Sequence, residues 1–410
     1  MPNWKSGFDP ALVVARLEEI TNRSDSGKVS FTGFEYSELK VLFNTMIEVD
    51  EKVPEIAKQG LIRSAIVRAA ERGPISPRTL IAEVCKQENK YFKKPFERFR
   101  LLTSISFSPF CEVPRFVFEG SHIVVNAKST LIEKKGRDEI LKTATRSLGG
   151  KLPNDYVRLS TSVQARSPHE AADLALWRLD FVRGIWNLWN NRGRHFRWSS
   201  GERKPVNQIV LGPVHTLHEQ NGNLATDSWW YEPQYQGPIA RFNSPNNIEH
   251  MVKFTENFRM HYRKSKYPSD IVEAVVRYVR ALDSSDWQDS FLRLWGVLEL
   301  LTGTQTDNYK VTIRRAAYMF AERDYSFQIL SHLRDQRNRI VHAGTAPNDV
   351  ESLMYQVKRY VEQLIQFHLG NAFRFESIAD AAEFMDLPND TKQIEKKIDK
   401  LTFAKSWLSE

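Results

Sequence analysis

Cysteine is scarce in this chain. Only Cys85 and Cys111 occur among 410 residues, with no Cys-x-x-Cys spacing and no histidine beside either of them. Two isolated thiols exclude a cysteine-rich zinc site, and so few cysteines favour a reducing compartment.

Long apolar runs are missing as well. The sequence has no run of about 18 apolar residues, which is the length that a membrane-spanning helix needs. Its first ten residues, MPNWKSGFDP, lack the apolar core of a secretion signal. We therefore expect a cytoplasmic protein with no membrane partner.

Positive charge is in modest excess. Lys and Arg number 58 against 50 Asp and Glu, which gives a net charge of +8 and a pI of about 9.2. This balance favours a polyanionic partner such as nucleic acid without requiring one. The hydrophobic content of 41% and the length predict two or three globular domains.

Hydrophobic periodicity predicts an α+β fold that is mostly α, in four segments. Residues 1–130 form a helical region with a small hairpin at 115–126. Residues 131–265 form a middle α+β domain, a candidate sensor or regulatory domain. Residues 266–372 form an antiparallel helical bundle with short loops. Residues 373–410 form a helical tail with a break at Pro388.

The hairpin in the N-terminal segment allows two interpretations. With the helices expected at 54–72 and 77–91, it could complete a winged helix-turn-helix that binds DNA or RNA through Arg78, Lys86 and Lys90. It could also belong to a helical packing domain, which we favour because helix pairs with a short turn occur in many α-rich proteins.

The middle segment is expected to contain a strand at 155–165, a helix that Ser167 caps, and further strands such as 207–212. A stretch rich in Trp, Phe and Arg follows the helix, and its RNA-contact candidates are Arg192, Arg194 and Arg197. The preferred alternative places the tryptophans in the core and leaves the arginines solvated. The aromatic segment 229–238 is either a ligand or partner surface or a loop held by its own rings.

The bundle contains the motif that we consider central, SHLRDQRNRIVHAG at 331–344, with Arg337, Asn338 and His342 in the spacing R-N-x-x-x-H. On an ideal helix, Arg337 and His342 lie roughly 140° apart, while Asn338 lies one turn before His342. Asn338 can therefore orient the imidazole. Arg337 can join them only if the helix end unwinds or if a second copy of the chain supplies the partner groups.

Around this motif the sequence resembles the HEPN family, most closely its Apea-like subgroup. The resemblance covers about residues 268–372 and includes LWGVLELLTG at 294–303. It implies a helical bundle that forms a homodimer, with two motifs facing each other, and it implies metal-independent RNA cleavage for active members.

Each candidate side chain then has an expected role. His342 would be the general acid or base, Arg337 would stabilise the phosphorane, and Asn338 would orient the imidazole. Supporting roles fall to Glu299, which would orient Arg337 or His342 or else form an ordinary ion pair, and to Arg334 at the phosphate. The cations Lys310, Arg314 and Arg315 would guide RNA, although at least one of them is expected on a solvated face. No carboxylate cluster accompanies the motif, so we expect no metal and no cofactor.

The family resemblance implies an RNA-cleaving toxin or anti-phage defence effector of abortive infection. A trigger ligand or a phage component could act through residues 1–250. Two alternatives remain: a non-catalytic RNA-binding or scaffold protein of the same family, and a DNA-binding regulator led by the winged helix.

Overall fold

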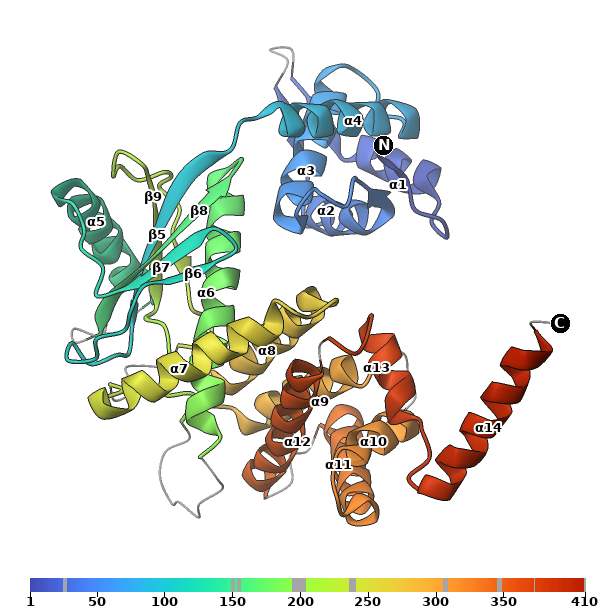
Figure 1. Cartoon of the computed structure of the whole chain (residues 1–410). Helices are drawn as coiled ribbons and strands as arrows, with labels where there is room; N and C mark the ends of the chain where they lie inside the picture. The colour runs from blue at the N-terminus through green and yellow to red at the C-terminus, as the bar shows by residue number, and fades with distance from the viewer. Residues whose placement is uncertain are drawn as a thin grey trace. The chain divides into compact units, whose positions relative to one another are not determined.

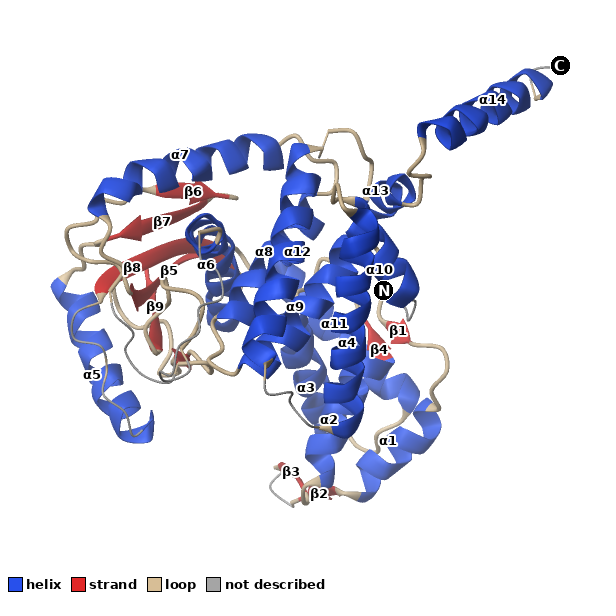
Figure 2. Cartoon of the chain, turned by 90° about the horizontal axis from the view of Figure 1, so that it is seen from below, coloured by secondary structure: helices blue, strands red, loops and turns tan. Residues whose placement is uncertain are grey.

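The computed structural model describes residues 1–24, 28–148, 152, 156–193, 204–235, 241–304, 309–344, 349–371 and 373–408. Within these ranges the chain is α+β and mostly helical, with fourteen helices and one six-stranded sheet (Figures 1 and 2). The predicted class is therefore confirmed at this level.

The chain divides into two compact units, which do not coincide with the four predicted segments. Unit 1 comprises 1–101, 162–176 and 217–228, and unit 2 comprises 102–161, 177–216 and 229–410. Three long strands and one long helix contribute residues to both units. A sequence-based boundary could not be placed correctly, because the division falls inside these continuous elements.

Unit 1 contains four helices around one apolar core. They are α1 (Pro10–Glu19), α2 (Glu35–Met46), α3 (Glu55–Glu71) and α4 (Pro77–Lys93). Two short strand pairs accompany them, β1 (Asn3–Trp4) with β4 (Ile47–Glu48) and β2 (Thr21–Arg23) with β3 (Val29–Phe31).

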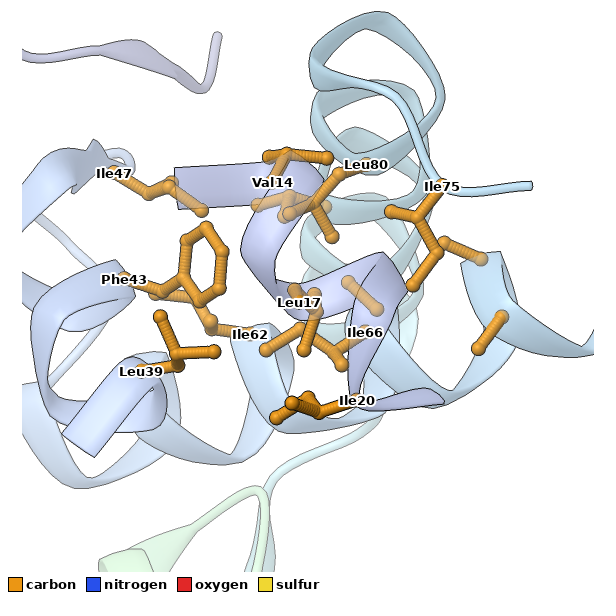
Figure 3. Close-up of a cluster of buried hydrophobic side chains, with 14 residues drawn as sticks. Val14, Leu17, Ile20, Leu39, Phe43, Ile47, Ile62, Ile66, Ile75 and Leu80 are labelled. Carbon is orange, nitrogen blue, oxygen red and sulfur yellow. The ribbon is translucent and has the colours of Figure 1, made fainter. Parts of the chain in front are cut away.

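Capping side chains and a shared core hold these helices in place. Asp9 accepts hydrogen bonds from the first two amides inside α1, and Ser76 forms a capping box at the start of α4. Figure 3 shows the core, in which Leu17, Phe43 and Ile62 come from three different helices. Burying such side chains is the main favourable contribution to folding of this unit.

The six-stranded sheet has the strand order β10-β9-β5-β8-β7-β6. Its members are β5 (Glu97–Ile105), β6 (Phe116–Phe118), β7 (Ser121–Val125), β8 (Val157–Ala165), β9 (Val214–Glu219) and β10 (Trp230–Tyr231). The hairpin expected at 115–126 is present as β6 and β7, and it turns at Glu119 and Gly120, both with positive φ. Because β7 continues the sheet beside β8, the hairpin extends the sheet and is not a separate wing.

The strand expected at 207–212 is absent. Residues 207–212 form no strand beyond a single bridge at Leu211. The loop is held by Asn187, which donates to the carbonyl of Ile209 and accepts from its amide, and by main-chain hydrogen bonds to residues 104–106. The middle of the chain also contains the helices α5 (Leu131–Leu148) and α7 (Pro245–Tyr262).

The remaining helices belong wholly to unit 2 or end in it. They are α6 (Pro168–Asn191), α8 (Pro268–Leu282), α9 (Trp287–Leu301), α10 (Tyr309–Tyr318), α11 (Arg323–Ala343), α12 (Val350–Gly370), α13 (Ile378–Met385) and α14 (Thr391–Trp407). Helix α9 packs against α8 and α12, and α10 packs against α11. Asp286 caps α9 by accepting from the amides of Gln288 and Asp289, whereas α8 begins at Pro268 without a side-chain cap.

A buried histidine ties three helices of this bundle together. The Nε2–H of His368 donates to the carbonyl of Leu301, and Nδ1 accepts from the Tyr267 hydroxyl, at 2.8 Å and 3.0 Å. Burial lowers the pKa of His368 to about 4. The imidazole is therefore neutral at pH 7 and joins α12 to the end of α9 and the start of α8.

A buried ionic network joins α6 to the segment that follows α8. The guanidinium of Arg183, 1% exposed, donates to both oxygens of Asp283 at 2.7 Å and to Asp180 at 2.8 Å. Arg280 reaches Asp180 and Glu232 from α8. A buried charge network of this kind is stable only while each charge keeps its partner.

No helix in the described part of the chain combines the length and the apolar content that a bilayer crossing requires.

Candidate functional site

Helix α11 presents the R-N-x-x-x-H motif near its C-terminal end. Leu330, Leu333 and Ile340 are buried and attach the helix to the bundle. The helix stops at Gly344, which takes the left-handed conformation with φ 64° and donates its amide to the carbonyl of Ile340. The apolar stripe thus fixes the helix, and the polar motif occupies its other faces.

Arg337 is half-buried and has a fixed position. Its Nη1 donates to Asn338 Oδ1 at 3.3 Å, and its guanidinium lies 4.9 Å from the ring centre of Tyr309 on α10. A guanidinium over an aromatic face gains cation–π attraction and loses freedom of movement. The positive charge of Arg337 is therefore held in place before any anion binds.

His342 is exposed in the last turn of α11, one turn beyond the half-buried Asn338. Among the described residues, no hydrogen bond joins His342 to Arg337 or to Asn338. The separation expected from helix geometry is therefore present, and a single copy of the chain does not bring the ends of the motif together.

The two supporting residues are engaged nearby. Glu299 Oε1 accepts from the Trp295 indole at 2.7 Å, one turn earlier on α9. Arg334 donates to Asp335 Oδ1 at 2.7 Å and 2.9 Å. An exposed pair of this kind contributes little to stability, so Arg334 can exchange Asp335 for a phosphate at small cost.

The three cations on α10 differ from one another. Lys310 is exposed. Arg314 and Arg315 both pair with Asp386 at the end of α13, and Arg315 also donates to the carbonyl of Thr302 at 2.7 Å. The side chain of Arg315 is 15% exposed against 56% for Arg314. Arg315 therefore holds α13 against α10, and Arg314 is the more accessible of the two.

The second RNA-contact candidate is the stretch rich in Trp, Phe and Arg after α6, and only its first part lies within the described residues. Trp186 is fully buried, edge-on to Phe107 and Phe116, so it belongs to the core as our preferred alternative stated. Arg192 is exposed and lies over the ring of Phe254, 5.6 Å from its centre. Arg194 and Arg197 lie outside the described residues.

Two residues near the motif were not identified from the sequence. Tyr309 holds Arg337, and its distance of 28 positions along the chain leaves no signal of that contact. Gln336 precedes the motif, and its buried Oε1 has no hydrogen-bond partner within the described ranges. A buried acceptor without a donor is unusual in a folded protein.

The same ranges contain no group of three or more His, Cys, Asp or Glu side chains arranged to hold a metal ion. Comparison with known proteins finds no family model, no curated protein and no solved structure that matches this chain.

Proposed function

We propose that the chain is a metal-independent endoribonuclease of the HEPN type. The observation that carries this proposal is that one bundle helix presents both a pre-positioned Arg337 and an exposed His342 near its C-terminal end. A permanent positive charge and a histidine beside the same phosphate are what transesterification of RNA needs.

In the proposed reaction the RNA 2′-hydroxyl attacks the adjacent phosphorus atom. One imidazole removes the proton of this hydroxyl, and a second imidazole gives a proton to the departing 5′-oxygen. The products are a 2′,3′-cyclic phosphate and a 5′-hydroxyl, so no water is consumed. Arg337 stabilises the charge on the pentacoordinate phosphorane.

Two copies of the chain supply these groups. Because Arg337 and His342 diverge on one helix, a symmetric dimer in which two α11 helices face each other is the arrangement that lets them converge. Asn338 then orients His342 from the preceding turn. We place this dimer in the cytoplasm as a toxin or defence effector, by the family resemblance.

A non-catalytic RNA-binding protein is the competing function. The lack of a contact between Arg337 and His342 within one copy favours it, because the same groups could simply hold phosphates. Cleavage activity distinguishes the two.

The test compares the wild type with His342→Ala on total RNA in the presence of EDTA. We expect the substitution to slow cleavage by roughly 10²- to 10⁴-fold, which is the usual contribution of a general acid or base. His332→Ala is the matched control, since His332 is also exposed on α11 and should leave the rate unchanged. Equal cleavage by the wild type and His342→Ala would overturn the proposal.

A further inference from the structure

Unit 1 contains a cavity of about 760 Å³. Residues of α2, α3 and α4 line it, together with Ser167 and His169 at the start of α6, which also belong to unit 1. The volume is within the range of small-molecule binding sites.

The lining of this cavity has charge of one sign. Lys40, Arg63, Lys90 and Lys94 contribute to it, whereas none of the described lining residues is Asp or Glu. No described carboxylate forms an ion pair with any of the four cations. Elsewhere in unit 1 cations are commonly paired, as Arg23 is with Glu18 at 2.7 Å. The cavity therefore concentrates positive charge that an anion can neutralise.

The start of α6 also reaches the cavity wall, through Ser167 and His169. Its first residue, Pro168, has no N–H, and the Glu170 amide already donates to Ser167 Oγ at 3.3 Å, so the positive charge of the wall comes from the four cations. The carboxylate of Glu170 accepts from the Arg166 amide at 3.1 Å. Glu170 and Arg166 also lie close enough to affect the pKa of Tyr91, which burial raises above its usual value.

One polar group in the wall lacks a partner. The buried Oδ1 of Asn44 has no hydrogen-bond partner among the described residues. The Tyr91 hydroxyl lies beside Arg166 and Glu170, and the ring of Tyr91 lies beneath Arg166, with its centre 5.2 Å from the guanidinium carbon. A buried acceptor is costly when unsatisfied, so a ligand that donates a hydrogen bond to Asn44 is favoured.

The middle of α3 supplies a third feature. Gly60 lines the cavity, and a Cβ built at this position meets no atom within 4 Å. Glycine destabilises a helix interior, and neither packing nor a positive φ requires it here. Its absent side chain leaves space open at the cavity wall.

We propose that this cavity binds a free nucleotide with at least two phosphates. The four cations hold the phosphates, and the apolar wall of Val41, Ile56 and Leu61 accommodates the base. The Oδ1 of Asn44 accepts a hydrogen bond from a ribose hydroxyl or a base amine, which inorganic phosphate does not have. A free nucleotide is favoured over an RNA strand because the cavity is of small-molecule size.

The experiment titrates the full chain by calorimetry with each of the four ribonucleoside 5′-triphosphates, with inorganic tripolyphosphate as competitor. Two variants disrupt the site: Gly60→Leu, which fills it, and Lys90→Glu, which reverses one charge. The matched controls are Gly60→Ala, which gives the same gain in helix propensity with little filling, and Lys93→Glu, on an exposed residue of α4 outside the lining.

We expect at least one nucleotide to bind more tightly than tripolyphosphate. Gly60→Leu and Lys90→Glu should each weaken binding by roughly tenfold or more, because a hydrogen bond to a charged group has about that effect. The two controls should stay within about twofold of the wild type. In thermal unfolding, the melting temperature of Gly60→Leu should be no lower than that of the wild type, which verifies that the variant folds.

Four results would overturn the proposal. The first is that none of the four nucleotides binds at about 1 mM, the weak end of specific affinities. The second is that tripolyphosphate binds as tightly as every nucleotide, which would reduce the cavity to an anion site. The third is that short RNA displaces the nucleotide and binds more tightly. The readout is binding by the full chain, and the variants at positions 60, 90 and 93 all lie in unit 1, so the result is independent of whether the chain cleaves RNA. Unchanged affinity in both Gly60→Leu and Lys90→Glu would place the nucleotide elsewhere and would also overturn the proposal.

Discussion

The neutral, buried His368 should make the helical bundle less stable in mild acid. It hydrogen-bonds Leu301 and Tyr267 as an uncharged ring, and protonation would require Nδ1 to give up the hydrogen bond that it accepts. Its pKa is about 4 in the folded chain against 6.5 for an unperturbed histidine. Between these values the unfolded state binds the extra proton, so the free energy of unfolding falls as pH falls.

The magnitude follows from that difference. A shift of one pKa unit corresponds to about 1.4 kcal/mol, so the full effect below pH 4 is about 3 kcal/mol. From pH 7 to pH 5 the loss should be about 2 kcal/mol. The contribution of His368 to the free energy of unfolding is fully present above its pKa in the unfolded state, and it is lost as pH falls toward its pKa in the folded state.

The assay is urea unfolding followed by far-ultraviolet circular dichroism at pH 7 and pH 5. His368→Gln is the reference, since its amide can donate to the Leu301 carbonyl but does not titrate. The wild type should lose about 2 kcal/mol more than this variant between the two pH values. An equal loss in both proteins would refute the reasoning and would mean that His368 is protonated without disturbing the bundle.

Three further substitutions test packing and charge. Gly184→Ala should lower the free energy of unfolding in urea by about 1–3 kcal/mol, because the new Cβ would lie 2.6 Å from a methyl group of Val275. An unchanged free energy of unfolding would disprove the close crossing of α6 and α8. Asp283→Asn should cost about 3–5 kcal/mol in the same assay, since it breaks the buried pair with Arg183, and a loss below about 1 kcal/mol would contradict that network. Gly60→Ala should raise the free energy of unfolding by about 0.5–1 kcal/mol, and a decrease would show that the space beside α3 is filled.

Local signals predicted most helix positions well. The helix expected at 77–91 is α4, and side chains of Asp9, Ser76 and Asp286 cap α1, α4 and α9, because an Ncap side chain needs only its own first turn. Helix α8 has no such cap. Pro268 already fixes the first helical residue there, and the preceding Tyr267 provides no side-chain cap.

Strand pairing was harder to foresee. β5 lies between β9 and β8, whose residues come more than 50 positions later in the chain. Nothing in residues 97–105 indicates those partners, because a strand's neighbours are decided by long-range burial. The loop at 207–212 shows the converse. Its apolar run is typical of a strand, yet the side chain of Asn187, far from it along the chain, bonds both backbone groups of Ile209.

The helix that carries the candidate residues was predictable, but the contacts of these residues were not. Helix periodicity predicts that Arg337, Asn338 and His342 share one helix, which is α11. Periodicity does not reveal that Tyr309 holds Arg337, or that Asp386 engages Arg315. These are contacts between helices, and they depend on how the bundle packs.

The measurement that tests the proposed function most directly is the chemistry of the cut ends. An RNA oligonucleotide cleaved in EDTA should give a 2′,3′-cyclic phosphate and a 5′-hydroxyl, and a single 2′-deoxy substitution at the cut position should abolish cleavage there. His342→Ala should form both products roughly 10²- to 10⁴-fold more slowly. A 3′-hydroxyl with a 5′-phosphate, or unchanged cutting of the 2′-deoxy substrate, would contradict attack by the 2′-hydroxyl and with it the assignment of Arg337 and His342.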